Sequence, residues 1–449
     1  MKIDFAREII LKTLYKIDVE NSYSNIILDD VLNKNRKRLS DRDISFITEI
    51  VYGVTTWRLT LDYIIEKYSK IKIKKISKWI LNIMRMGVYQ IIFLDKVPKS
   101  AAVNESVNLS KKYGIKSSSF VNAILRKIEK SDFEKLNNII NDVERISKIT
   151  SMPEWIVKEL NKEHDIQKTE EICIGCNIKP KICIRVNTLK TNKEELKEKL
   201  VERKIAFEEK NLENFIYLNN IKNVTDIDLY KEGFFTLQDE AAGLTSIVLD
   251  PKKGEEILDC CSAPGGKTTH LAEIMKNDGS ILAWDVHKSR LDLVEENSNR
   301  LGIDIINIKE HDASMFKKEY IEKFDRILLD VPCLGLGVIR RKPDIKWQRK
   351  EEDIEEINKI QYKILENCSK FLKKGGYMVY STCSIICSEN DKIIQEFLKN
   401  NEKEFEIVKK YDNKNEITNF LNNINSKGMI KLYPNNFNDG FFICFLRKK

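Results

Sequence analysis

Two short segments of this 449-residue chain carry cysteines in a setting suited to chemistry. Asp330 to Cys333 has the sequence Asp-Val-Pro-Cys, and Ser381 to Ser384 has the sequence Ser-Thr-Cys-Ser. A cysteine thiolate is a strong nucleophile that also leaves readily, so it suits covalent catalysis, in which one difficult step becomes two easier ones. Taken alone, either cysteine would more often be a small buried residue, so its surroundings must decide.

A third segment carries a glycine pair suited to ligand binding. Residues Asp259 to Thr269 include Gly265 and Gly266, which let the backbone approach a ligand closely, and the N-terminus of a following helix favours a negative group such as a carboxylate. A lone glycine pair is more often a structural turn. Here Asp285 follows about 20 residues after the pair, where a carboxylate accepts ribose hydroxyls, and Asp312 is placed to meet an adenine edge.

Alternating strands and helices in the C-terminal part position all three segments. The pattern predicts strands at 256–261, 280–285, 304–308, 325–330 and 376–381, and helices at 268–276, 289–301 and 353–372. The strand interiors are apolar, which favours a parallel sheet covered on both faces, with ligands outside the carboxyl ends of its strands. The candidate residues all fall at those ends.

The rest of the chain divides by pattern into further domains. Apolar residues at three- and four-residue spacing predict an all-α N-terminal domain at residues 1–130, followed by a helical connector at 131–176. Alternation in 181–186 then predicts a small α+β module at 177–235. The remaining residues, 236–449, form the predicted α/β domain, which is Rossmann-like.

Positive charge is concentrated at the N-terminal end. Residues 1–130 contain 25 Lys and Arg against 14 Asp and Glu, a net charge of +11, whereas the whole chain carries +8. The remainder therefore carries 8 − 11 = −3. This asymmetry suits a domain that meets a phosphate backbone, although a solvated helical surface is an equally good explanation of charge alone.

Composition indicates a globular protein of the cytoplasm without a metal site. No apolar run approaches the roughly 18 residues that span a bilayer, and the first residues lack a secretory signal. The ten cysteines are expected to be reduced thiols. Cys173 and Cys176 form a lone C-x-x-C pair, but zinc needs two more ligands and the four histidines are scattered, so no metal is expected.

The three motifs together resemble those of a known family. The run from Asp259 to Thr269 resembles the cofactor motif of the Sun (Fmu) family of RNA 5-cytosine methyltransferases. The Pro-Cys and Thr-Cys segments match two further signatures of the family, with Glu389 and Asn390 just downstream. Residues 97–105 and 120–126 resemble the helical RNA-binding domain of the NusB antitermination proteins. Over almost its full length the chain is similar to the bacterial Sun/RsmB type.

This resemblance implies a cofactor and roles for individual residues. S-adenosylmethionine is expected to bind at ten positions: Cys261, Ser262, Ala263, Pro264, Gly265, Gly266, Lys267, Asp285, Asp312 and Asp330. Cys383 is the expected nucleophile, Cys333 the thiol that assists product release, and Asp330 the acidic partner of the base. DNA 5-cytosine methyltransferases instead use the Pro-Cys thiol for attack, so the family match decides the assignment.

The expected chemistry follows from the low reactivity of the cytosine ring. Carbon 5 of cytosine is a poor nucleophile, but addition of a thiolate to carbon 6 gives an enamine-like intermediate whose carbon 5 attacks an electrophilic methyl group. An acid at the ring nitrogen beside the amino group stabilises the adduct. Removal of the carbon-5 proton and expulsion of the thiolate then complete the cycle.

The resemblance also implies a substrate, small-subunit (16S) ribosomal RNA, and hence a part in ribosome biogenesis. Two alternatives remain: the same chemistry on another RNA such as tRNA, or a non-catalytic RNA-binding or antitermination factor. In the family pattern Lys267 approaches the methyl donor or Asp330, although a lysine at a helix start is often solvated. The basic segment Arg340 to Trp347 suits phosphate contact and base stacking, but a solvated charge run closed by a core tryptophan fits it almost as well.

Overall fold

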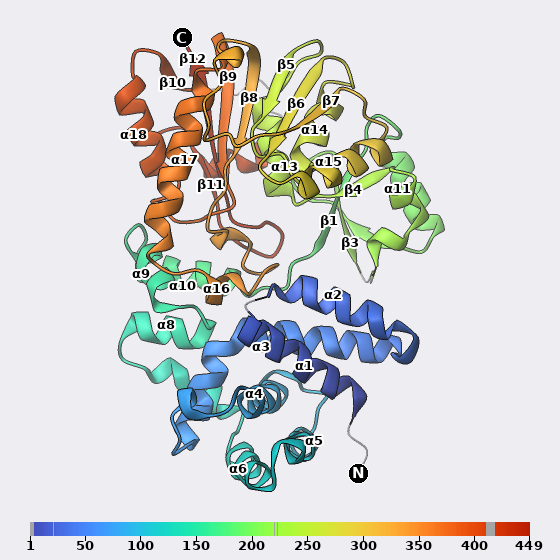
Figure 1. Ribbon diagram of the computed structural model, residues 1–449, viewed down its shortest axis with the longest axis vertical. Helices are drawn as coiled ribbons and strands as arrows, with labels where there is room; N and C mark the ends of the chain where they lie inside the picture. Colours follow the sequence, from blue (N-terminus) through green and yellow to red (C-terminus); the bar gives the residue numbers. More distant parts are fainter. Residues whose placement is uncertain (1–3, 21, 220, 222, 410–417) are drawn as a thin grey trace. The chain divides into compact units, whose positions relative to one another are not determined.

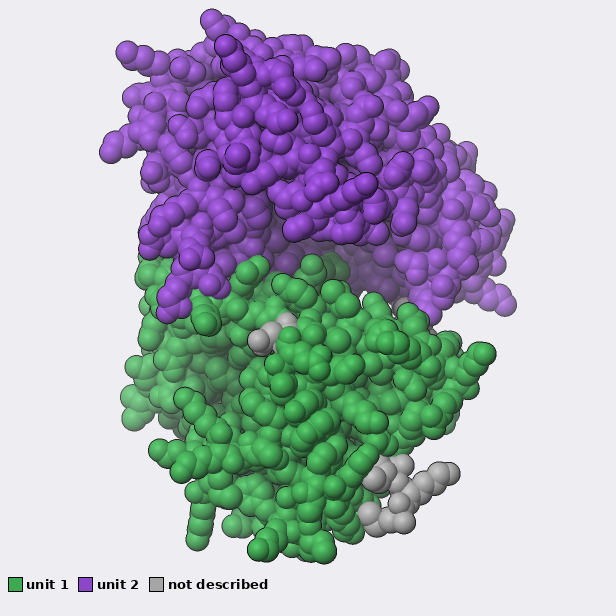
Figure 2. All heavy atoms as spheres, viewed as in Figure 1, with its two compact units in different colours: residues 1–177, 339–351 green, residues 178–338, 352–449 purple. Residues whose placement is uncertain are grey.

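The computed structural model describes residues 4–20, 22–219, 221, 223–409 and 418–449. Two compact units make up the chain (Figure 2). Unit 1 contains residues 1–177 together with 339–351, and unit 2 contains residues 178–338 and 352–449. A short segment from within the C-terminal part of the sequence therefore belongs to the N-terminal unit.

Unit 1 is helical, which confirms the predicted all-α N-terminal domain. Its first helices are α1 (Phe5–Glu20), α2 (Ser24–Asn35), α3 (Asp41–Tyr68), α4 (Lys78–Phe93), α5 (Lys99–Ser110) and α6 (Ile115–Leu125). Ser40 begins α3 through a capping box with Asp43, in which each side chain bonds the other residue's backbone N–H. Every residue of α4 from Ile80 to Ile92 is buried, so this helix lies at the centre of the unit.

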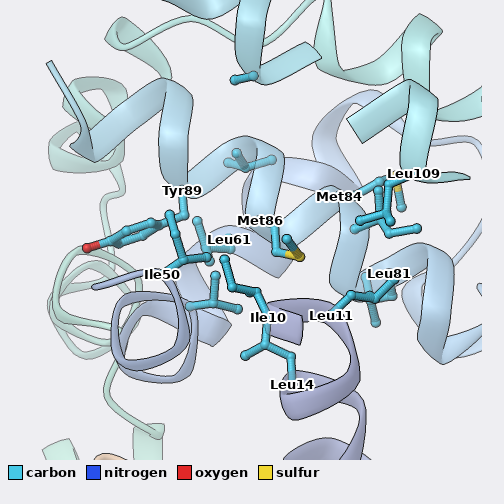
Figure 3. Close-up of a cluster of buried hydrophobic side chains, with 14 of the residues drawn as sticks. Ile10, Leu11, Leu14, Ile50, Leu61, Leu81, Met84, Met86, Tyr89 and Leu109 are labelled. Atoms are coloured by element: carbon cyan, nitrogen blue, oxygen red, sulfur yellow. The ribbon is translucent and has the colours of Figure 1, made fainter. Parts of the chain in front are cut away.

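The core of this unit gathers apolar side chains from several helices. Figure 3 shows residues of α1, α3, α4 and α5 packed together, among them Ile10, Ile50, Met84 and Leu109. Further along the chain lie the short helices α7 (Ser131–Glu134), α8 (Asp142–Thr150), α9 (Glu154–Asn161) and α10 (Ile166–Gly175). The inserted segment contributes α16 (Ile345–Gln348).

Unit 2 begins with a small antiparallel sheet. Its strands are β1 (Ile182–Val186), β2 (Ala206–Glu208), β3 (Phe215–Asn219) and β4 (Phe235–Leu237), in the order β2-β3-β1-β4. The helices α11 (Lys193–Glu202) and α12 (Asp228–Lys231) complete the α+β module. Its fold class is as predicted.

A larger mixed sheet forms the C-terminal domain (Figure 1). Its strands are β5 (Glu256–Asp259), β6 (Ser280–Asp285), β7 (Ile306–Glu310), β8 (Phe324–Asp330), β9 (Leu372–Thr382), β10 (Phe405–Ile407), β11 (Ile430–Leu432) and β12 (Phe441–Lys448). The order is β10-β12-β9-β8-β5-β6-β7, with β11 paired to β12. Strands β5 to β9 are parallel, as the sequence predicts. Strand β12, for which the sequence predicted no strand, runs antiparallel to β9, so the complete sheet is mixed.

Helices cover both faces of this sheet, as the sequence predicts. They are α13 (Glu240–Leu249), α14 (Gly266–Ile274), α15 (Lys288–Leu301), α17 (Asp353–Ser369) and α18 (Asp391–Asn401). Successive strand residues enter different cores: Ile257 packs with α13 and α14, whereas Leu258 packs with α17 and α18. Side chains of a strand alternate between faces, so both faces of the sheet are buried.

Candidate active site

The three predicted motifs begin where neighbouring parallel strands end. Strand β5 ends at Asp259, β6 at Asp285, β8 at Asp330 and β9 at Thr382. Asp330 lies opposite Ser381 in the register of β8 and β9. Because the carboxyl ends of parallel strands meet at one edge of the sheet, the topology brings the motifs together.

A cavity of about 530 Å³ lies at this edge, a size typical of small-molecule sites. Four cysteines and three carboxylates share its wall. The lining residues are Cys260, Cys261, Ala263, Asp285, Val286, Arg290, Asp312, Ala313, Ser314, Asp330, Val331, Pro332, Cys333, Ile360, Ile364 and Cys383. The structure thus brings together the three expected catalytic residues and five of the ten expected cofactor residues.

Two of these cysteines, Cys333 and Cys383, are in direct contact. Their Sγ atoms lie 3.2 Å apart, and both side chains are partly exposed. The pKa of Cys333 is raised well above its ordinary value, first by the hydrogen bond with Cys383 and second by burial. Cys333 is therefore a neutral thiol at physiological pH while Cys383 is beside it.

Asp330 is held from both sides. Its Oδ2 lies 2.6 Å from the Nζ of Lys267, and its Oδ1 accepts a hydrogen bond of 2.9 Å from Ser381 Oγ. Burial lowers the pKa of Lys267, but the Asp330 carboxylate outweighs burial and the net pKa is raised. Lys267 is thus a charged partner of Asp330 in the interior and not a solvated lysine at a helix start.

Glu389 connects the segments that carry the two cysteines. Its buried carboxylate accepts a 2.8 Å hydrogen bond from the backbone N of Leu334 and another from Ser384 Oγ. Leu334 follows Cys333, and Ser384 follows Cys383. The sequence placed Glu389 just downstream of a family signature but gave it no role, since only the fold reveals that it reaches both loops.

The other five residues expected to bind the cofactor lie in the glycine motif and do not line the cavity. These are Ser262, Pro264, Gly265, Gly266 and Lys267. Gly265 has a left-handed backbone with φ 98°, and a Cβ there would approach Val294 Cα to 3.1 Å. Thr268 donates a 2.7 Å hydrogen bond to Asp259, whose pKa burial raises to about 7. Their predicted contact with a cofactor stays a prediction.

Arg290 is a neighbour of the cavity that sequence reasoning missed. Its Nη1 lies 3.2 Å from Asp285 Oδ2, and its Nη2 donates a 2.8 Å hydrogen bond to the carbonyl of Ala263. Asp285 also accepts from the backbone N of His287 at 3.0 Å. Arg290 therefore ties the end of β6 to the glycine loop.

Arg185 supports the same loop from the small sheet. This fully buried side chain of β1 bonds both carboxylate oxygens of Glu273 on α14, at 2.9 and 2.8 Å, and donates to the Gly266 carbonyl at 2.8 Å. Such bidentate pairing fixes orientation as well as charge. In the sequence Arg185 was one residue of an alternating strand, and nothing there marked it.

The segment from Arg340 to Trp347 lies in unit 1, where parts of it are covered. Lys346 is 1% exposed and its Nζ donates to Asn177 Oδ1 at 2.6 Å, while Trp347 Nε1 donates to the Thr55 carbonyl at 2.7 Å. Burial lowers the pKa of Lys346 to about 8. The predicted phosphate contact is wrong for Lys346, because its ammonium is enclosed by protein.

Within the described ranges, no group of His, Cys, Asp and Glu side chains is arranged to hold a metal ion. No helix in that part of the chain is both long enough and apolar enough to cross a membrane.

Comparison with known proteins accounts for most of the chain. The family described as 16S rRNA methyltransferase RsmB/F matches residues 246–447, the NusB family matches 5–130, and the ferredoxin-like domain of RsmF/B-like methyltransferases matches 152–225. The probable ribosomal RNA small subunit methyltransferase B of Bacillus subtilis is 36% identical over 100% of both chains. The chain belongs to the Sun/RsmB family. The resemblance inferred from the motifs is confirmed, including its NusB-like N-terminal domain.

Other members of the Sun/RsmB family and a solved structure agree. The corresponding protein of Synechocystis is 35% identical over 99% of each chain. The crystal structure of PH0851 is 27% identical, covers 100% of both chains and gives a TM-score of 0.80. The multidomain architecture is thus shared with a solved structure from end to end.

Proposed function

We propose that this protein transfers a methyl group from S-adenosylmethionine to carbon 5 of a cytosine in small-subunit ribosomal RNA, with Cys383 as covalent nucleophile. The observation that carries the proposal is the pair of thiols 3.2 Å apart, beside Asp330, on the wall of one cavity. Membership of the Sun/RsmB family supports the methyl transfer and the ribosomal substrate.

The cavity suits the cofactor in size and charge. Three carboxylates, Asp285, Asp312 and Asp330, line it, and the cofactor combines a positively charged sulfur with two ribose hydroxyls. Asp285 would hold the ribose and Asp312 the adenine edge. When bound, the cofactor supplies an electrophilic methyl group for carbon 5.

The first step joins protein and base. The thiolate of Cys383 forms a bond to carbon 6, and the electron density displaced toward the ring is stabilised by a proton at the nitrogen beside the amino group. To serve, Asp330 must enter this step protonated or share a proton with the base, and it takes the proton back when the cycle ends. Lys267 and Ser381 hold its carboxyl group in place. Asp330 thereby acts as the acidic partner of the base.

The last step breaks the same bond, and Cys333 is suited to assist it. Once carbon 5 carries the methyl group, its proton must leave so that the bond between carbon 6 and the Cys383 sulfur can break and release the thiolate. The hydrogen bond with Cys383 is the first cause of the raised Cys333 pKa. Formation of the adduct would remove the proton and charge of Cys383 and so weaken this cause, while burial would continue to raise the Cys333 pKa. Cys333 lies beside the sulfur that must leave, which is the position of a group that assists release.

Incubation with methyl-labelled S-adenosylmethionine and separated RNAs tests the proposal. Label is expected in small-subunit ribosomal RNA, and digestion should release 5-methylcytosine. Label in transfer RNA alone would move the same chemistry to another substrate. Absence of label in every RNA would leave an RNA-binding factor without catalysis.

A further inference from the structure

The connection between α3 and α4 carries a dense group of positive charges. Four lysines occur within six residues, and the sequence contains no Asp or Glu between Lys67 and Leu94. We refer to residues 70–75 as the lysine loop; its lysines are Lys70, Lys72, Lys74 and Lys75. All four are exposed on unit 1. The loop lies between the end of α3 and the start of α4 (Figure 1).

Many lysines of the same unit have an acidic partner. Lys34 pairs with Asp30 at 2.8 Å and Lys112 with Glu8 at 2.8 Å, as do several lysines elsewhere on the unit. Among the residues that the structure describes, no ion pair joins a carboxylate to any lysine of the loop. Four of the positive charges of the N-terminal domain therefore lie within six residues without a carboxylate beside them.

The backbone of the lysine loop is held in place beneath these charges. Ile76 is buried and Ile73 is half-buried, and both pack against the helical core of the unit. A turn of 3-10 helix (Ile73–Lys75) is closed by a 2.8 Å hydrogen bond from Lys75 N to the Lys72 carbonyl. Ile73 and Ile76 thus anchor the loop, while its four lysines remain exposed.

The adjacent aromatic residues leave little room for base recognition. Trp79, in the first turn of α4, stacks against both Tyr15 and Tyr113, with ring centroids 3.8 and 5.1 Å away. Its indole is thus already engaged by two rings of the protein. The surface offers positive charge without a means of reading sequence, which is the character of a backbone contact.

We propose that the lysine loop binds the phosphate backbone of the substrate RNA, without regard to its sequence and away from the cytosine that reacts. The inference rests on the proposed function in taking RNA as the partner. Each lysine that neutralises a phosphate of a single strand displaces condensed counterions and steepens the salt dependence of binding by about 0.7 in log–log slope.

The test compares two full-length variants with the same loss of charge. One is K70Q/K72Q/K74Q/K75Q, and the other changes four lysines of unit 1 that have acidic partners: K34Q/K99Q/K158Q/K168Q. Fluorescence anisotropy with two single-stranded RNA oligomers of different sequence gives the dissociation constant across a potassium chloride series. If all four loop lysines contact phosphates, the loop variant loses about 2.8 of the slope.

That change is large enough to measure. Between roughly 50 and 200 mM salt, the wild type should lose about fifty-fold more affinity than the loop variant, equally for both oligomers. The control variant should keep a slope close to that of the wild type. A loop variant with the wild-type slope, or an effect confined to one oligomer, would overturn the inference.

Two further readouts separate this inference from the proposed function. If the wild type binds RNA through the loop but methylates none, the loop assignment stands and the catalytic proposal fails. If the wild type binds no RNA, and the loop variant instead loses binding to vesicles containing about one third phosphatidylserine, the loop is a membrane contact and the RNA assignment is wrong.

Discussion

Replacement of Asp285 by alanine should weaken cofactor binding by a predictable amount. The residue is 3% exposed, and its carboxylate already accepts from His287 N and pairs with Arg290. An ionised carboxylate offers about four acceptor positions, so about two remain for ribose hydroxyls at the cavity wall. Hydrogen bonds to a charged group contribute about 1.5–3 kcal/mol, and burial limits screening by solvent.

The expected loss in Asp285→Ala is that of one such bond, because water entering the space left by the carboxylate solvates the second hydroxyl. The dissociation constant for S-adenosylmethionine should rise about 10- to 150-fold. Calorimetric titration without RNA measures it directly. Asp292→Ala, an exposed position on α15 with the same change of charge, is the matched control and should bind as the wild type does.

Arg290→Ala tests whether the ion pair between Arg290 and Asp285 itself contributes to cofactor binding. Half of the Arg290 side chain is exposed, so solvent screens its ion pair with Asp285 on that side. Its removal frees acceptor capacity on Asp285, which keeps the hydrogen bond from His287 N, and affinity should change only a few-fold. An Asp285→Ala protein that unfolds at the wild-type temperature and binds the cofactor with wild-type affinity would refute the argument. Asp285 would then be a structural partner of Arg290 alone.

Three other predictions concern catalysis and stability. Cys383→Ala should abolish both methyl transfer and any covalent protein–RNA species, whereas Cys333→Ala should accumulate a complex that resists denaturation on a gel; the reverse pattern would exchange the two roles. Arg185→Ala should lower the free energy of unfolding in urea by about 3–5 kcal/mol, because Glu273 is left buried and unpaired, and replacing both residues by methionine should recover much of the loss. Lys346→Met should stabilise the protein below pH 8, where the buried ammonium of the wild type opposes folding. This gain in stability over the wild type should shrink as the pH rises from about 8 toward 10.5, because in that range the unfolded wild-type chain binds a proton that the folded protein does not. If denaturant titrations give a constant gain across that range, the buried ammonium is not its cause.

The local pattern of apolar residues in the sequence was sufficient to predict where the motifs lie in the fold. Apolar strands that alternate with helices place Asp285 and Asp330 at strand ends, and parallel topology then requires those ends to meet. Strand β12 and its antiparallel direction were not predicted; an apolar run such as Phe441–Lys448 is typical of a strand but carries no sign of its direction.

Residues that act across long distances in the chain were the ones missed. Arg185 meets Glu273, and Glu389 meets the backbone of Leu334, through contacts that exist only once the sheets have formed. Trp347 shows the same limit, since a basic run with an aromatic residue fits an exposed loop as well as a covered one. Trp347 is held by a hydrogen bond to the carbonyl of Thr55, which lies nearly 300 positions earlier in the sequence.

The return of residues 339–351 to unit 1 has a consequence for synthesis on the ribosome. Domains generally fold as the chain emerges, beginning at the N-terminus. Here the partners of Asn177 and Thr55 are Lys346 and Trp347, which are translated only after the whole of residues 178–338. Most of the N-terminal unit therefore emerges first, but it can complete its fold only after residues 339–351 have been translated. A chain released before residue 351 would lack part of this segment.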